Sequence, residues 1–278
     1  MKNKNILGHL QIIVSSSLFG LMPLITKMAY SYGATPITVA FCRCFYATII
    51  LAVILPFMRK NIFSIERKQI VPMLKIAIPF GLIPVTLFIA YTYLDSGMAT
   101  ILFYTHPIFV MVLSILMYHT FPSKKQILCM ILCLAGIVLL NAIQGEMKVV
   151  GIAVAILAGF IYSVYVIACD QKGIDEIDPT VLSFWINLFA SIAVGIIGIV
   201  TGQLMIVTEP MGQLSMFVLA LLVSVIAVLL FQHGVLVTGG LKASLLSTFE
   251  PLTSLFIGMI VFHELLTCLL YTSPSPRD

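Results

Sequence analysis

The chain consists of long apolar runs separated by short polar segments. A helix needs about 20 mainly apolar residues to cross the hydrocarbon core of a bilayer. Segments that meet this requirement lie at 8–30, 36–57, 70–93, 97–119, 126–143, 149–169, 179–201, 213–238 and 243–263. Most are apolar on every face, which is typical of helices surrounded by lipid and by other helices. The pattern therefore predicts an all-α fold, a polytopic bundle of transmembrane helices.

Prolines inside these spans each remove one backbone donor from their helix. They are Pro23, Pro79, Pro84, Pro107 and Pro251. Membrane helices tolerate such residues because neighbouring helices and polar side chains can satisfy the freed carbonyl groups. We expect kinks at these positions.

The composition agrees with a lipid environment. Hydrophobic residues make up 60% of the chain and charged residues 9%, whereas a soluble domain carries roughly 25% charged residues. The net charge of +4 is spread along the loops, without the clustered basic face that nucleic acid requires. Lys2 and Lys4 before an apolar run imitate a signal peptide, but no cleavage site follows. We interpret 8–30 as a retained first helix.

The basic residues of the loops are unevenly distributed, and this predicts the orientation of the chain. With a cytoplasmic N-terminus, the inner segments hold Lys2, Lys4, Arg59, Lys60, Arg67, Lys68, Lys124, Lys125, Lys172 and Lys242. The outer loops hold Lys148. We therefore expect a multi-pass membrane protein whose N-terminus and whose loops at 58–69 and 170–178 lie in the cytoplasm.

The two halves of the chain correspond to each other at a shift of 143 to 144 positions. The pairs that coincide are Ala99–Leu102 with Ala243–Leu246, Pro107 with Pro251, His106 with Glu250, Pro36 with Pro179, and Phe41 with Phe184. The repeating unit has five helices, an odd number, so the second copy must cross the membrane in the opposite sense. Inverted repeats of this kind are typical of secondary transporters, with the substrate site near the midplane between the halves.

Motifs in order along residues 8–267 resemble one family. They are Ser17-Leu18-Phe19-Gly20, Lys27, Pro36 with Arg43, Tyr104-Thr105-His106-Pro107-Ile108-Phe109-Val110, Ser247-Thr248-Phe249-Glu250-Pro251-Leu252-Thr253 and Phe262-His263-Glu264-Leu265-Leu266-Thr267. In this order they resemble the EamA-type members of the drug/metabolite transporter superfamily, which have ten helices in a five-plus-five arrangement. One departure is His119-Thr120, where that family usually keeps a glutamate.

This resemblance implies a secondary transporter of the plasma membrane, the inner membrane of a bacterium, that works by alternating access. It also implies export of small metabolites such as amino acids or related compounds. Coupling to protons is one alternative for the driving force, and a homodimer is compatible with the sequence.

The second copy lacks the fifth helix that the first copy has at 126–143. Residues 268–278 follow instead, and their sequence resembles a translated sequencing-library adapter, so we exclude them from the fold. A natural short polar tail is the alternative interpretation. We expect a first repeat at 1–145, a second repeat at 146–267 without its last helix, and a native gene that encodes a tenth helix.

Ionisable groups inside the spans are the main candidates for a transport site, because a charge in the bilayer costs roughly 2.5–3.5 kcal/mol on insertion scales. Glu250 and His106 each precede a proline. They could bind a proton or a cationic part of the substrate, or they could hydrogen-bond backbone groups at the kink. Arg43 lies deep in its span and is the candidate partner for an anionic group.

Tyr104, Trp185 and Asn187 are further candidates for lining the site, although Tyr and Trp also occupy membrane interfaces. A different pattern, with Gly or another small residue at every fourth position, occurs on one span. Its members are Gly151, Ala155, Gly159 and Ser163. Such a stripe predicts close helix–helix packing rather than chemistry.

No enzyme motif accompanies these residues. His263-Glu264 begins a zinc-binding pattern, but Thr267 stands where the second histidine is required. There is no phosphate-binding loop and no nucleophile elbow. We therefore expect no cofactor and no metal, with a small-molecule substrate and the lipid bilayer as partners and no nucleic acid. A membrane-embedded enzyme or a sensory or scaffold subunit is the alternative class.

Overall fold

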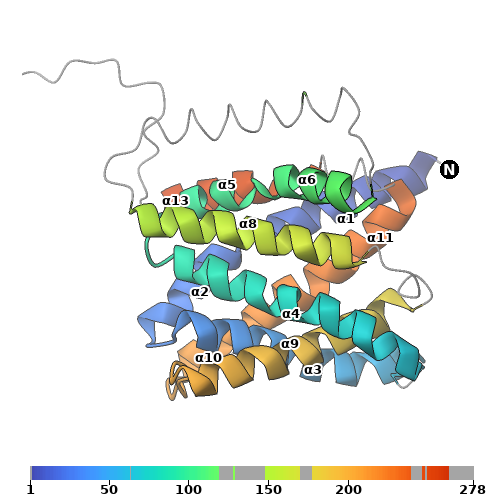
Figure 1. Ribbon diagram of the computed structural model, residues 1–278, viewed down its shortest axis with the longest axis horizontal. Helices are drawn as coiled ribbons and strands as arrows, with labels where there is room; N and C mark the ends of the chain where they lie inside the picture. Colours follow the sequence, from blue (N-terminus) through green and yellow to red (C-terminus); the bar gives the residue numbers. More distant parts are fainter. Residues whose placement is uncertain are drawn as a thin grey trace, which may run out of the picture.

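The computed structural model describes residues 2–62, 64–118, 128, 148–169, 177–238, 246–247 and 249–262. Every regular element among these residues is a helix, and the helices lie side by side in a bundle (Figure 1). The prediction of an all-α polytopic bundle is confirmed.

The helices of the first half are α1 (Lys2–Gly20), α2 (Met22–Ser31), α3 (Pro36–Phe57), α4 (Arg67–Ala90), α5 (Ser96–Phe103) and α6 (His106–Tyr118). Those of the second half are α8 (Val149–Cys169), α9 (Pro179–Val200), α10 (Pro210–Leu219), the π-helix η1 (Ala220–Ala227), α11 (Val228–Thr238) and α13 (Phe249–Phe262). Helices α10, η1 and α11 follow one another without a loop, so a π-helical segment lies in the middle of one span.

Within the described residues, 7 helices are long and apolar enough to cross a membrane. They are Ile6–Ser31, Pro36–Phe57, Arg67–Ala90, Gly97–Met117, Val149–Cys169, Pro179–Val200 and Pro210–Phe231. Each coincides with a span that the sequence predicts. The predicted span at 126–143 lies outside the described residues apart from Leu128, and the span at 243–263 is described in part.

The prolines act differently from one helix to the next. A break separates α1 from α2 at Leu21, two residues before Pro23, and another separates α5 from α6 just before Pro107. A turn at Ser247 precedes α13, which contains Pro251. Helix α4, by contrast, continues without a break through Pro79 and Pro84. The three breaks therefore fall where prolines predict them, and α4 shows that packing can keep a helix continuous through proline.

Helices α3 and α9 end in the same way. Arg59 after α3 and Gly202 after α9 both have a left-handed backbone, with φ of 56° and 65°. The amide of the next residue then donates to a carbonyl five residues back, from Lys60 to Leu55 at 3.1 Å and from Gln203 to Gly198 at 3.0 Å. This is the Schellman helix cap. The matching residues are 143 positions apart, the spacing of the predicted repeat.

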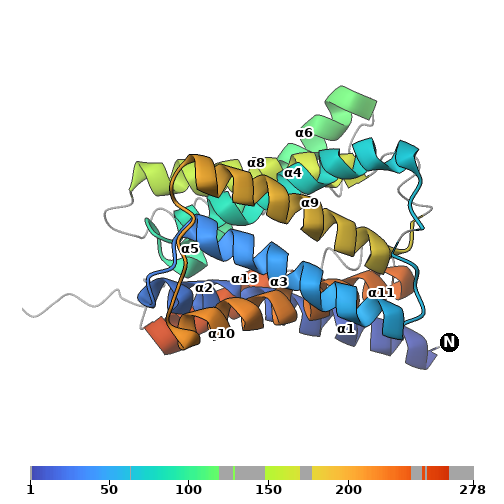
Figure 2. The same ribbon diagram turned by 90° about the horizontal axis from the view of Figure 1, so that it is seen from below.

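The two halves are interlocked rather than side by side. Helix α8 of the second half packs against α4, α5 and α6 of the first, while α1 of the first packs against α11 and α13 of the second. Helices α3 and α9 contact each other, while α9 also packs against α4 and α3 against η1 (Figure 2). The core of the bundle is consequently built by both halves together.

Small residues make the closest helix contacts possible. A Cβ atom added to Gly159 on α8 would lie 2.8 Å from the carbonyl oxygen of Phe103, and one added to Gly20 on α1 would lie 2.8 Å from the carbonyl oxygen of Glu250. Ser163, one turn after Gly159, donates to the carbonyl oxygen of His106 at 2.9 Å. The small-residue stripe predicted on α8 is therefore a packing face, and it lies against the break before α6.

Candidate functional site

Arg43 carries a positive charge into the bundle. It lies in the second turn of α3 and is 7% exposed. Its Nε donates to Oγ of Ser224, on the π-helix η1, at 2.8 Å. The guanidinium carbon lies 5.7 Å from the centre of the Phe80 ring on α4, close enough for a cation–π interaction. Three helices thus position this side chain and compensate part of its lost hydration.

Glu250 brings a carboxyl group into the same bundle. It lies in the first turn of α13, where the helix dipole favours a carboxylate. The hydroxyl of Tyr104 lies 2.8 Å from Oε2 of Glu250 and 3.0 Å from the carbonyl oxygen of Ser247. Because Tyr104 belongs to the first half and Glu250 to the second, the two helix breaks face each other across the repeat.

His106 opens α6 and lies among aromatic rings. Its ring centre is 4.4 Å from that of Tyr162 on α8, 5.2 Å from that of Tyr104 and 5.3 Å from that of Phe103. His106 is the first residue after the α5–α6 break, and its imidazole lies against Tyr162 of α8. The structure therefore brings His106 and Tyr104 together with Glu250.

A continuous row of rings connects the two charges. The rings that follow one another from Arg43 to Glu250 are Phe80, Tyr165, Tyr162, His106 and Tyr104, with neighbouring centres 4.4 to 5.7 Å apart. We call these five rings the aromatic arc. It is drawn from α4, α8 and the α5–α6 break, and it joins a cation on α3 to a carboxylate on α13.

The aromatic arc lies inside the bundle, but it is not fully covered. Glu250, Tyr162 and Tyr165 are each partly buried and retain accessible surface. The charges of Arg43 and Glu250 attract each other through this interior. Among the described residues, Arg43 and Glu250 do not form a direct ion pair.

A set of hydroxyl groups accompanies this site. The hydroxyl of Tyr91 at the end of α4 lies 3.4 Å from Oγ1 of Thr100, which in turn lies 3.3 Å from Oγ of Ser254 on α13. All three residues are buried. They connect α4, α5 and α13 close to the break that carries Tyr104, and so they support the position of Glu250.

Trp185 and Asn187, on α9, make different contacts. The indole Nε1 of Trp185 donates to the carbonyl oxygen of Ile62 at 2.9 Å, which ties α9 to the loop after α3. The amide nitrogen of Asn187 donates to the carbonyl oxygen of Ser183 at 2.8 Å, while its buried Oδ1 has no hydrogen-bond partner among the described residues. The polar atoms of both residues thus bind backbone groups rather than the aromatic arc.

Some residues of the site have no signal of their own in the sequence. Ser224 is a small polar residue in a long apolar run, and Phe80 is one of many aromatic residues in the spans. Thr100 lies in the repeated segment Ala99–Leu102, and Ser254 directly follows the motif that ends at Thr253. Ser224 and Phe80 contact Arg43, and Thr100 contacts both Tyr91 and Ser254. These contacts depend on how the helices are rotated about their axes, which the sequence does not show.

An apolar helical bundle that encloses opposite charges between two interlocked halves defines a class, the multi-pass membrane transporters. The comparison with known families agrees. Residues 6–142 and residues 149–272 each match the EamA-like transporter family. The chain therefore belongs to the EamA-like transporter family, and one copy of the family's unit lies in each half.

A relative supports the same class. The chain is 24% identical over 192 residues to the uncharacterized transporter sll1319 of Synechocystis sp. (strain ATCC 27184 / PCC 6803 / Kazusa). The similar region is 66% of this chain and 56% of that relative. The chain thus matches little more than half the length of this relative, whose name specifies no substrate.

Proposed function

We propose that the protein is a secondary transporter that exports small metabolites carrying both charges, amino acids or related compounds, by alternating access of two inverted five-helix halves. The observation that carries this proposal is the aromatic arc with Arg43 at one end and Glu250 at the other. A carboxylate matches the guanidinium, an ammonium group matches Glu250, and the rings between them provide apolar and π surface.

The basic residues support an orientation for this transport. Arg59, Lys60, Arg67 and Lys68 lie at the end of the bundle where Lys60 contacts Asp178. Because basic loops stay in the cytoplasm, we assign this end to the cytoplasmic side of the plasma membrane. Reporter fusions in the loops at 58–66 and 201–209 test the assignment, and a cytoplasmic signal from 201–209 would contradict it.

Flux from proteoliposomes tests the function directly. Vesicles containing the protein are loaded with a radiolabelled mixture of amino acids, and the efflux is compared with that of protein-free vesicles. We expect Arg43→Ala and Glu250→Ala to reduce the protein-dependent flux at least tenfold, because each leaves one end of the substrate unpaired. Lys68→Ala is the matched control, since it removes an exposed charge outside the site.

The driving force is a separate part of the proposal. Tyr104 contacts both Glu250, through its hydroxyl, and His106, through its ring. Carboxyl and imidazole groups can both exchange a proton. We propose exchange of the substrate for protons through these two groups. An imposed pH gradient should then change the initial rate of efflux. A rate that is independent of the gradient would exclude proton coupling and leave the transport function intact.

A further inference from the structure

Helices α3 and α9 pack against each other and run in opposite directions (Figure 2). The Cβ position of Gly198, near the end of α9, lies 3.0 Å from Ile37 near the start of α3. At the other end, Lys60 just after α3 contacts Asp178 just before α9. One end of the bundle therefore contains the start of α3 and the loop after α9. The other end contains the start of α9 and the loop after α3.

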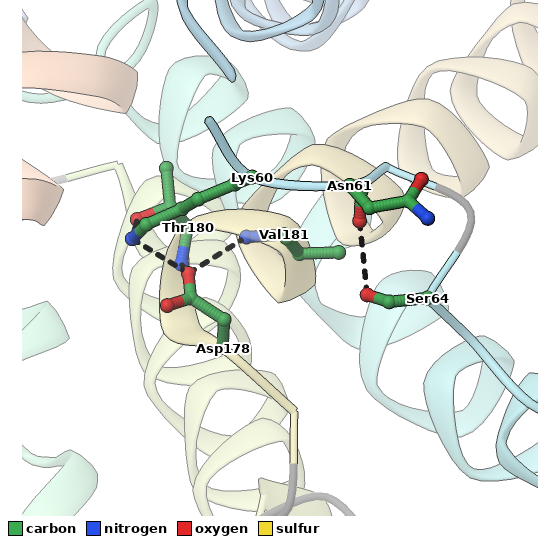
Figure 3. Close-up of polar contacts among 6 residues, drawn as sticks. All are labelled: Lys60, Asn61, Ser64, Asp178, Thr180 and Val181. Atoms are coloured by element: carbon green, nitrogen blue, oxygen red, sulfur yellow. Dashed lines mark hydrogen bonds and ion pairs between the residues drawn. The ribbon is translucent and has the colours of Figure 1, made fainter. Parts of the chain in front are cut away.

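The end with Lys60 is closed by charged contacts. The ammonium group of Lys60 donates to Oδ1 of Asp178 and to Oγ1 of Thr180, both at 2.9 Å (Figure 3). The same carboxylate oxygen caps α9 by accepting from the amides of Thr180 and Val181. The loop around Lys60 is held further by the bond from Trp185 to Ile62. We call Lys60, Asp178 and Thr180 the ionic latch.

The opposite end is closed by hydroxyl groups. Oγ1 of Thr35, the cap of α3, donates to the carbonyl oxygen of Gln203 at 2.6 Å. Oγ1 of Thr38 accepts from the amide of Met205 at 2.9 Å. We call Thr35, Thr38, Gln203 and Met205 the hydroxyl latch. Thr35 corresponds to Asp178 and Gln203 to Lys60 at the repeat spacing of 143, so the latches occupy equivalent places at opposite ends.

The two latches differ in chemistry although the repeat relates them. Both join the first half to the second, and apolar side chains of the two halves pack beside each latch. A transporter that opens alternately must break the inter-half contacts at one end while it keeps those at the other. The ionic latch and the hydroxyl latch have the position that this requirement demands, at opposite ends of helices α3 and α9.

We propose that the ionic latch and the hydroxyl latch are the two gates of this transporter, and that their relative strengths set the population of its two access states. The proposal rests on the alternating-access function proposed above. Weakening one latch shifts the equilibrium toward opening at that end and, because the states exclude each other, toward closure at the other. Weakening the ionic latch and weakening the hydroxyl latch should therefore change the accessibility of a given end in opposite directions.

Cysteine labelling at two equivalent positions tests this directly. Ser183 lies in the second turn of α9 just inside the ionic latch, and Ala40 lies at the equivalent place in α3 just inside the hydroxyl latch. Their exposed fractions are 6% and 0%. Ser183→Cys and Ala40→Cys are introduced separately, reconstituted protein is treated with a charged methanethiosulfonate reagent, and labelling at each position is measured by mass spectrometry.

We expect Lys60→Ala and Asp178→Asn to raise the labelling rate at position 183 about two- to fivefold, the range that one exposed ion pair supports, and to lower it at position 40. Asparagine keeps the helix cap, so Asp178→Asn removes the charge alone. Thr38→Val should have the reverse effect at the two positions. Lys68→Ala is the control, because its ion pair with Glu66 lies at the same end but within one half.

The outcomes separate gating from damage. A variant that misfolds becomes more labelled at both positions, whereas a gate variant changes them in opposite directions. The proposal is overturned if Lys60→Ala behaves as Lys68→Ala does, or if Thr38→Val and Lys60→Ala shift accessibility the same way.

Cross-linking links the gate to transport. Cysteines at positions 60 and 178, joined by a reducible bifunctional methanethiosulfonate, should reduce amino-acid efflux at least tenfold until a reductant is added. The single variant Asp178→Cys treated with the same reagent is the control. Unchanged efflux after complete cross-linking contradicts the gate. If the parent protein moves no amino acid, the proposed function fails, and the labelling experiment still decides whether the latches control access.

Discussion

The hydroxyl of Tyr104 donates a hydrogen bond to the carboxylate of Glu250 over 2.8 Å, although the two residues are 146 positions apart. Tyr104 lies in the break between α5 and α6, and Glu250 follows the turn before α13. Each break precedes a proline, and the two breaks occupy the same place in the two halves. The contact therefore joins equivalent irregular segments of both copies, at the place where we propose that the substrate binds.

Removal of either partner of this contact should weaken transport. Glu250→Gln keeps the size of the side chain and its acceptor oxygen but removes the charge, and we expect amino-acid efflux to fall at least tenfold. Tyr104→Phe leaves the carboxylate without its donor, which is worth about 1.5–3 kcal/mol for a charged group, and should lower the rate about tenfold. Initial rates from proteoliposomes measure both. Tyr32→Phe, outside the site, is the control, and parent-like flux in Glu250→Gln would remove the carboxylate from the mechanism.

The position of Arg43 should matter as much as its charge. Ser224→Ala removes the acceptor for Nε of Arg43. Because an unpaired buried polar group costs about 1–3 kcal/mol, the apparent KM for efflux should rise about tenfold. Arg43→Lys keeps the charge but lacks the planar group that can both bond Ser224 and stack on Phe80. Kinetics over a range of internal amino-acid concentrations measure the effect. Ser215→Ala is a matched control, because Ser215 bonds carbonyls of its own helix; a KM equal to that of the parent in Ser224→Ala would contradict the assignment.

The packing of α8 should be intolerant of one methyl group. The Cβ of Gly159→Ala would lie 2.8 Å from the carbonyl oxygen of Phe103 and 3.1 Å from Oγ1 of Thr105. Both belong to the segment around the α5–α6 break, so we expect a loss of about 1–3 kcal/mol, as for other overpacked sites. Thermal unfolding in detergent measures this loss. Leu157→Ala, on the exposed face of the same helix with 47% exposure, should change the midpoint much less.

Acid should weaken the contact at Asp178. Partial burial raises the pKa of this carboxyl, but the hydrogen bonds from Lys60 and from the amides of Thr180 and Val181 outweigh it and hold the pKa below its usual value. A lowered pKa means that the stabilisation is present at neutral pH and is lost as the pH falls through the folded-state value. The effect is modest because the carboxylate is 41% exposed.

Thermal unfolding of the parent and of Asp178→Asn between neutral and acidic pH measures this dependence. The parent should be the more stable at neutral pH, and the difference should shrink as the carboxyl becomes protonated below its ordinary pKa of about 3.9. A constant difference over the whole range would show that the charge of Asp178 contributes nothing.

Much of the framework can be predicted from the sequence. The spans, the breaks before Pro107 and Pro251 and the packing stripe on α8 follow from local properties, namely apolar length, missing backbone donors and small side chains at helical spacing. The π-helix at Ala220–Ala227 has no such signal, because its residues are as apolar as those around it. It matters because it contains Ser224, the partner of Arg43.

The candidate site was only partly predictable. Arg43, His106 and Glu250 are conspicuous because ionisable groups are rare and costly in lipid, and Tyr104 lies beside one of them in the chain. Trp185 and Asn187 have the right chemistry in the right kind of span, yet their polar atoms bind the carbonyl groups of Ile62 and Ser183. A role for these two in substrate binding stays a prediction.

By itself, the sequence determined that this protein is a bundle of membrane helices with charges inside, because solvation by lipid acts on each segment separately and can be recognised along the chain. Tertiary structure alone decided which charges and rings meet. Arg43 reaches Ser224 across 181 positions, and Lys60 reaches Asp178 across 118. Such pairs depend on the depth and rotation of each helix in the bundle, and these are set by the packing of all the helices together rather than by any one of them.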